Sequence, residues 1–161
     1  MTETHVPWNA LNNLNSLNAL NAPEAAEVQV GRLIDEFTAQ TPGVTSTVLV
    51  YADGLTLADS GGLPRENREC LAAVVSGFVA LARGAVSIHG RGRMNQILVD
   101  MDADGGFLCI MSVSEGSAMG VLCGPACDIG LVAYEAARLA DRVGPSLTPE
   151  VRSELRRVLL A

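Results

Sequence analysis

A charge-free segment in the middle of the chain constrains the fold more than any other feature. Residues 70–82 contain no Asp, Glu, Lys or Arg, whereas four charged residues lie just before them, within 65–69. A helix that is apolar on all sides has to be covered on all sides. We therefore predict a helix over residues 65–86 that packs on its own chain on one side and needs a second layer on the other.

Two stripes of different size follow this predicted helix. One stripe is bulky and contains Leu71, Val74, Phe78, Leu81 and Ala85. The other stripe is small and contains Ala73, Ser76, Gly77, Ala80 and Gly84. Glycine inside a helix costs up to about 1 kcal/mol relative to alanine, so two glycines on one stripe indicate that another backbone comes close. We predict that the small stripe is a homodimer interface; a helix buried entirely within one copy is the alternative.

Hydrophobic periodicity and turn residues predict the remaining elements. A first helix starts at Pro23 and is stopped by Thr41-Pro42-Gly43. The predicted strands cover residues 44–51, 55–59, 93–100, 106–113 and 118–123, and a third helix covers 129–143. The order α-β-β-α-β-β-β-α predicts an α+β fold with a five-stranded antiparallel sheet between helices, plus a C-terminal tail helix that begins at Pro149.

Composition divides the chain into three parts. Residues 1–22 are rich in Asn and Leu and are expected to be a flexible tail; a segment that folds onto a partner is the alternative. Residues 23–145 form the predicted domain, and residues 146–161 form an amphipathic helix. With 48% hydrophobic residues in a chain of 161, this domain can bury a core of its own.

The residue inventory excludes several classes of function. The formal net charge is −7, which argues against a surface that neutralises nucleic-acid phosphates. The chain has no Lys, so it has neither a P-loop lysine nor a Schiff-base lysine. Its two histidines, His5 and His89, give no support for a catalytic triad or a zinc-protease motif. We therefore predict a non-enzyme without catalytic residues or a cofactor.

Three short motifs resemble binding sites, and each has a simpler interpretation. Residues 100–105 match the first half of an EF-hand loop, but its twelfth position is Met111, so a charged hairpin turn is expected. Cys123 and Cys127 have the spacing of half a zinc site without a second pair, and we expect no metal. Arg91 and Arg93 lack the nearby aromatics typical of an RNA contact.

Cysteine usage and the N-terminus suggest a compartment. The four cysteines, at 70, 109, 123 and 127, lie among apolar residues, which is typical of core thiols rather than of a disulfide framework. The N-terminus has no basic region before an apolar one, and the apolar stretch 71–82 is too short to span a bilayer. We expect a cytoplasmic protein with reduced thiols and no direct membrane insertion.

Several short motifs, in this order, resemble the Roadblock/dynein light chain family. They are PGV at 42–44, VLVYADG at 48–54, LAD at 57–59, the Ala- and Gly-rich helix, and GPACDIGLVAYEAARLA at 124–140. The resemblance covers roughly residues 25–143. It is greatest to the stand-alone actinobacterial branch, which occurs in operons with a sensor-kinase-like protein and a small Ras-like GTPase.

The resemblance implies a function as well as a fold. It implies a homodimer in which the second helices lie side by side and the third strands pair. It also implies a regulator or scaffold for a small Ras-like GTPase, with the sensor-kinase-like protein as a further partner. In the gliding-motility relatives the GTPase is stimulated without an inserted arginine, which argues against an arginine finger from Arg91 or Arg93. Recruitment to the membrane by partners remains open.

Six charged residues are the candidate partner contacts. They lie at the start of the second helix and in the loop that follows it: Arg65, Glu66, Arg68, Glu69, Arg91 and Arg93. Ordinary solvated side chains are the alternative at each position. A different function, a small-molecule sensory module of the GAF or PAS type, shares the same element order and would require an enclosed cavity of about 300 Å³ or more.

Overall fold

The computed structural model describes residues 25–102 and 104–160. The predicted tail, residues 1–22, lies outside them. The first helix covers residues 25–40. The other elements are β1 (Val44–Tyr51), β2 (Thr56–Asp59), α2 (Arg65–His89), β3 (Gln96–Met101), β4 (Gly106–Ser114), β5 (Ser117–Cys123), α3 (Ile129–Val143), a 3₁₀ turn (Gly144–Ser146) and α4 (Pro149–Leu160).

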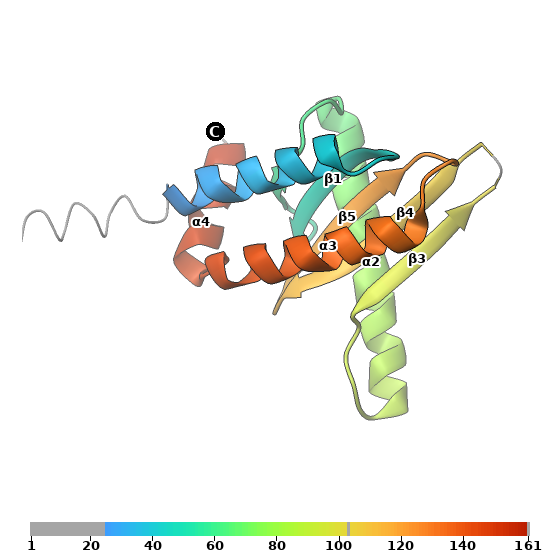
Figure 1. The fold of residues 1–161 in the computed structure, drawn as a ribbon. Helices are drawn as coiled ribbons and strands as arrows, with labels where there is room; N and C mark the ends of the chain where they lie inside the picture. The colour runs from blue at the N-terminus through green and yellow to red at the C-terminus, as the bar shows by residue number, and fades with distance from the viewer. Residues whose placement is uncertain (1–24, 103, 161) are drawn as a thin grey trace, which may run out of the picture.

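The five strands form one antiparallel sheet in the order β2-β1-β5-β4-β3. The first helix and α3 cover one face of this sheet, and α2 crosses the opposite face (Figure 1). This confirms the predicted α+β class and the predicted order of elements. Because helices cover both faces, the central strands β1, β4 and β5 are rich in buried apolar residues.

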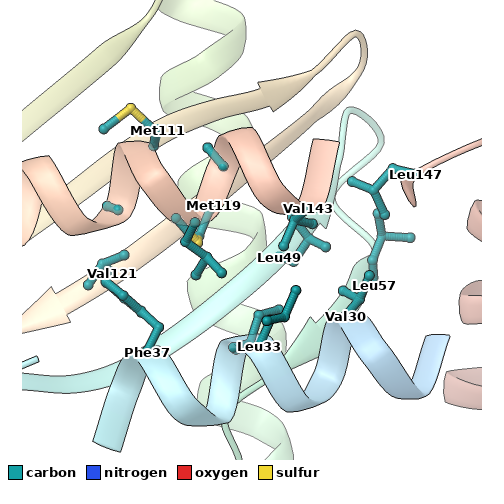
Figure 2. Packing of buried hydrophobic residues seen from close by; sticks show 14 of the residues in the cluster. Val30, Leu33, Phe37, Leu49, Leu57, Met111, Met119, Val121, Val143 and Leu147 are labelled. Carbon is teal, nitrogen blue, oxygen red and sulfur yellow. The ribbon is translucent and has the colours of Figure 1, made fainter. Parts of the chain in front are cut away.

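The larger core lies between the sheet and the two helices of the first face. Ile34 of the first helix, Leu49 of β1 and Val132 of α3 are each 1% exposed or less. Figure 2 shows this packing at close range. Leu147, Val151 and Leu155 extend the same cluster to α4, so the C-terminal helix is part of this core.

The smaller core lies between the sheet and α2. Four residues of α2 are buried there: Leu71, Ala72, Val75 and Val79. Opposite them, β5 carries Gly120, and a Cβ at that position would lie 2.4 Å from Cγ2 of Val75. The absence of a side chain at Gly120 therefore lets α2 approach the sheet closely.

Local signals explain the elements whose bounds the sequence predicted best. The β1 strand covers 44–51 as predicted, and the Asp53-Gly54 turn follows it, with Gly54 at φ 85°. Helix α3 covers 129–143 as predicted, because Asp128 caps it by accepting a hydrogen bond from the Leu131 N–H at 3.1 Å. Thr148 caps α4 in the same way, accepting from the Val151 N–H at 3.3 Å.

Other details differ from the sequence prediction. Strand β3 begins at Gln96 rather than at residue 93, and α2 continues to His89, where Gly90 ends it in the left-handed conformation. In the first helix Leu33, Ile34 and Phe37 are buried, whereas Val28 is 68% exposed and Val30 is fully buried. The apolar residues of the C-terminal half therefore face the core, and at the start of the helix only Val30 of the two valines does.

Candidate functional site

The outward side of α2 is the most unusual surface of the described chain. Three large apolar side chains are exposed on it: Val74 at 40%, Leu81 at 74% and Ile88 at 91%. We call this surface, with the small residues between these three, the outer face of α2. The C-terminal half of the helix also extends past the sheet (Figure 1), so part of this face has no layer beneath it.

The predicted small stripe lies mainly on this outer face. Ala73, Gly77, Ala80 and Gly84 are exposed, and Ser76 is half-buried. A Cβ added at Gly77 or Gly84 would meet no heavy atom of the described chain within 4 Å. No neighbour within the described chain therefore accounts for either glycine, and their role in an interface stays a prediction.

The predicted bulky stripe is split between two environments. Leu71 is buried against the sheet, whereas Val74 and Leu81 point away from it. The side of α2 that contacts the sheet is centred on positions 71, 72, 75 and 79 rather than on one bulky stripe. Since the helix is apolar on every side, its sequence could not identify which side would meet the sheet.

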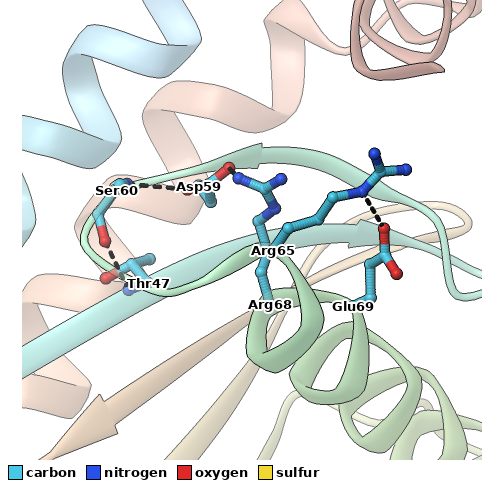
Figure 3. Close-up of polar contacts among 7 residues, drawn as sticks. Thr47, Asp59, Ser60, Arg65, Arg68 and Glu69 are labelled. Atoms are coloured by element: carbon cyan, nitrogen blue, oxygen red, sulfur yellow. Dashed lines mark hydrogen bonds and ion pairs between the residues drawn. The ribbon is translucent and has the colours of Figure 1, made fainter. Parts of the chain in front are cut away.

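Four of the six candidate contacts lie at the start of α2. Arg65 pairs with Glu69 at 2.7 Å, and this hydrogen bond raises the pKa of the Arg65 guanidinium (Figure 3). Arg68 pairs with Asp59 of β2 at 3.2 Å, and both side chains are mostly buried. Arg68 therefore attaches the start of α2 to the sheet, whereas Glu66 is exposed.

The other two candidates, Arg91 and Arg93, lie exposed between α2 and β3. Because α2 has 25 residues, it separates the two groups by about 37 Å at 1.5 Å per residue. One copy of the chain therefore does not bring the six candidates together. No carboxylate among the described residues pairs with Arg83, Arg91 or Arg93.

Two grooves of appreciable volume lie at the surface. One has a volume of about 640 Å³ and runs between α2, the segment before β3, the end of β4, and α3; Arg83 and Arg93 line it. The other, about 410 Å³, lies between the first helix and α3. Both are bounded partly by exposed residues, unlike the enclosed cavity expected of a small-molecule sensory module.

The cysteines lie in three different environments. Cys109 and Cys123 are buried in the larger core, and desolvation raises the pKa of Cys109 and raises that of Cys123 to about 12. Cys127 is half-buried, and Cys70 is exposed on α2, which corrects the expectation of four core thiols. Among residues 25–102 and 104–160, no group of three or more His, Cys, Asp or Glu side chains could hold a metal ion.

One polar cluster was not identified from the sequence. Tyr51 of β1 contacts two arginines of α4, with its ring centre 5.4 Å from the Arg152 guanidinium carbon and 5.5 Å from that of Arg156. Arg156 also pairs with Asp53, and Arg152 donates to the backbone oxygen of Glu115 at 2.9 Å. These contacts attach α4 to two turns of the sheet. The one sequence signal was the spacing of the two arginines, which places both on one side of a helix.

Helix α2 is also the one helix of the described residues that is long and apolar enough to cross a membrane, judged by length and composition alone. The apolar stretch 71–82, which the sequence marks as too short to span a bilayer, is only part of this helix of 25 residues. Four of its residues are packed on the sheet, and helices that pack in a protein core can meet the same criteria of length and composition.

The fold and the outer face of α2 together define a class of α+β domain, in which a sheet is covered on both faces and one long helix retains an uncovered apolar side. Residues 31–122 match the family model described as the Roadblock/LC7 domain. The chain therefore belongs to the Roadblock/LC7 family, as the motifs at 42–59 indicated.

Solved structures agree with this assignment. A Roadblock/LC7 domain from Streptomyces avermitilis is 30% identical, with a TM-score of 0.67 over 73% of this chain and 96% of that one. MglB from Myxococcus xanthus is 18% identical, with a TM-score of 0.65 over 73% of this chain and 93% of that one. An MglB with a tetrameric arrangement is 16% identical, with a TM-score of 0.66 over 81% of this chain and 93% of that one. No curated protein matches the sequence significantly.

The Streptomyces domain agrees with the actinobacterial branch that the motifs resemble. The two MglB structures, at lower identity, show the shared fold. The family model ends at residue 122, so α3 and α4 lie outside the matched region.

Proposed function

We propose that this chain is a non-catalytic, homodimeric regulator or scaffold that binds a small Ras-like GTPase and modulates its GTP/GDP cycle in a bacterial signalling system. It acts in the cytoplasm, with a sensor-kinase-like protein as a further partner. Membership of the Roadblock/LC7 family supports the general kind of function. The observation that carries the proposal is the outer face of α2, where Val74, Leu81 and Ile88 are exposed.

The physical argument concerns the cost of leaving this face in water. Burying apolar surface is worth about 25 cal/mol per Å², so a second copy that covers three large side chains gains several kcal/mol. Small residues between them let two helices approach closely. A homodimer would thereby remove the surface that is least compatible with an isolated copy.

The test has two stages and uses the full chain. Its mass in solution is measured at micromolar concentration, where a dimer is expected. Each Ras-like GTPase encoded in the same genome is then purified, loaded with GTPγS or GDP, and titrated against the dimer. Binding of one GTPase with a preference for one nucleotide state supports the proposal. Absence of binding in both states to every GTPase would overturn it.

The sensory-module alternative predicts a different result. It requires a small molecule inside the domain, whereas the volume of about 640 Å³ lies in a surface groove lined by Arg83, Arg93 and Asp141. A ligand that co-purifies with the chain and raises its Tm would favour this alternative.

A further inference from the structure

A triplet repeat occupies most of the chain that precedes the first helix. Residues 8–22, which lie outside the described residues, read WNA-LNN-LNS-LNA-LNA. Each triplet has Trp or Leu at its first position and Asn at its second. Residues 6–23 contain no Asp, Glu, Lys, Arg or His, so this segment can make contacts only through apolar side chains and uncharged polar groups.

The period of three indicates how the repeat presents its leucines. A polyproline II helix has about three residues per turn, so every third side chain lies on one side of it. An α-helix, with about 3.6 residues per turn, would spread the leucines around its axis. Prolines at positions 7 and 23 flank the repeat, and the residue before a proline is disfavoured in the helical region. The pattern is therefore that of an extended segment with one apolar side.

A groove that fits such a segment lies between the first helix and α3, which cover the same face of the sheet (Figure 1). Its volume is about 410 Å³. Its apolar lining includes Leu33, Phe37, Leu131 and Leu139, and Leu131 is 40% exposed. The charged lining residues are two acids and two arginines, Glu36, Glu135, Arg138 and Arg142. Because these charges balance, the groove suits an uncharged occupant with apolar side chains.

The length of the repeat matches the length of the groove. On the first helix the groove extends from Leu33 to Gln40, about 12 and 22 Å from residue 25 at about 1.5 Å per residue. In a polyproline II helix, Leu17 and Leu14 lie about 25 and 34 Å before residue 25, at about 3.1 Å per residue. For both pairs the difference is about 12 Å, which is the length of the four residues 21–24. Two consecutive leucines of the repeat therefore reach the two ends of the groove, and four residues remain to reverse the chain direction.

We propose that residues 8–22 dock along the groove between the first helix and α3 of their own copy, with Leu14 and Leu17 against its apolar lining. The Asn side chains then lie beside the charged rim, where an amide can donate to a carboxylate and accept from a guanidinium. The direct connection to the first helix keeps the segment at a high effective concentration, so a weak contact is sufficient. This inference is independent of the proposed function, because it involves neither the outer face of α2 nor a GTPase.

Tryptophan fluorescence of the full chain tests the contact, because Trp8 is the single Trp of the sequence. One variant carries Trp8→Leu and Leu17→Trp, which keeps Trp at a first position of the repeat. The matched control carries Trp8→Leu and Ser16→Trp, which places it at a third position. Trp at 17 is expected to emit at a shorter wavelength and to be quenched by acrylamide about twofold less than Trp at 16, as for a segment docked in half of the molecules or more. Equal emission and equal quenching at the two positions would overturn the inference.

A substitution in the groove shows what covers this Trp. Leu131→Glu, added to the Leu17→Trp variant, is expected to raise the quenching to that of the Ser16→Trp control. The fold should persist, because residue 131 lies in the first turn of α3, where an acidic side chain is favourable, and circular dichroism checks this. Val158→Glu, at a residue of α4 that is 51% exposed, should leave the quenching low. Protection that survives Leu131→Glu would place the segment elsewhere, such as on the outer face of α2, and would overturn the inference.

Mixing distinguishes docking within one copy from docking between copies. The chain with Leu17→Trp and Leu131→Glu is mixed with an excess of a chain that carries only Trp8→Leu and therefore has an intact groove and no Trp. The quenching is expected to stay high, because each segment reaches only the groove of its own copy. A return of the protection would show that the segment crosses to another copy, which contradicts the proposal.

Discussion

Helices α2 and α3 pack on opposite faces of the same sheet and differ in how completely their apolar surface is buried. In α3 the buried side contains Val132, Ala136 and Leu139, and the outward side carries Glu135 and Arg138 as an ion pair at 3.4 Å. In α2 the outward side carries Val74, Leu81 and Ile88, which are 40%, 74% and 91% exposed, whereas the exposed large apolar residues of α3 are Leu131 and Tyr134. Packing within one copy therefore accounts for most of the apolar side of α3, but for only one of the two apolar sides of α2.

This difference separates residues that maintain the fold from residues available to a partner. An amphipathic helix completes its burial when it meets the sheet. A helix that is apolar on both sides still exposes one apolar surface after folding. Burial of that surface requires contact with another molecule. The predictions below compare the two helices, beginning with the largest expected effect.

Truncation of a leucine on each helix gives the strongest contrast. Leu139→Ala, at a residue of α3 that is 3% exposed, is expected to lower the free energy of unfolding by about 2–5 kcal/mol. Leu81→Ala, at a residue that is 74% exposed, should change the unfolding of a single copy by about 0.5 kcal/mol or less and weaken self-association. Denaturant unfolding and sedimentation, each over a range of concentrations, measure the two effects. Equal losses in a monomeric protein would contradict the comparison.

Enlarging the small stripe should act on association alone. Gly77→Leu is expected to weaken the dimer by about 1–3 kcal/mol through overpacking, as measured by sedimentation equilibrium. Within one copy the position is open, so the added side chain should not destabilise the fold. Gly31→Leu is the matched control, because Gly31 also lies in a helix with no described neighbour within 4 Å. An unchanged dimer with Gly77→Leu would place the interface elsewhere.

The start of α3 depends on one side chain, and the start of α2 does not. Asp128→Ala removes the acceptor of the Leu131 N–H and should lower the free energy of unfolding by about 1 kcal/mol. At the start of α2, Pro64 makes no side-chain cap. Glu66→Ala is therefore expected to change stability by about 0.5 kcal/mol or less in urea denaturation. A larger loss with Glu66→Ala than with Asp128→Ala would reverse the contrast.

The buried thiol of Cys123, in the larger core, should make the stability of the fold depend on pH. Burial holds the pKa of Cys123 at about 12 in the folded chain, above its ordinary value of 9.0. The folded state therefore retains a proton that the unfolded chain loses, and the stability due to this thiol is complete below pH 9 and declines from pH 9 to 12. At pH 10 the loss is about 1 kcal/mol relative to pH 8, and Cys123→Ala should abolish this part of it.

The local features of the fold were readable from residues close together in sequence. Asp128 and the Gly144-Pro145 pair bound α3, and alternation with the Asp53-Gly54 turn bounds β1. These signals are local because a cap or a tight turn is satisfied within a few residues. The bounds of β3 were less predictable, because Arg93 to Asn95 could extend the strand and only the sheet decides where pairing begins.

The sequence identified residues of the candidate site but not how they are arranged in space. The charge pattern identified Arg65, Glu66 and Arg91, all of which are exposed. It did not distinguish Arg68 from its exposed neighbours, although Arg68 forms an ion pair with Asp59 of β2. It also missed the contacts of Tyr51 with Arg152 and Arg156, because Tyr51 is distant from both in sequence. Contacts of this kind depend on how elements pack, which local patterns do not encode.

By itself, the sequence determined which segments form helices and strands, their order, and the presence of one helix that is apolar all round. Those properties follow from the periodicity, caps and turns of neighbouring residues. Only the tertiary structure decided which side of α2 faces the sheet and which side remains exposed. The reason is that an apolar helix is nearly symmetric about its axis, so the close approach permitted by Gly120, in a strand far along the chain, fixes its rotation.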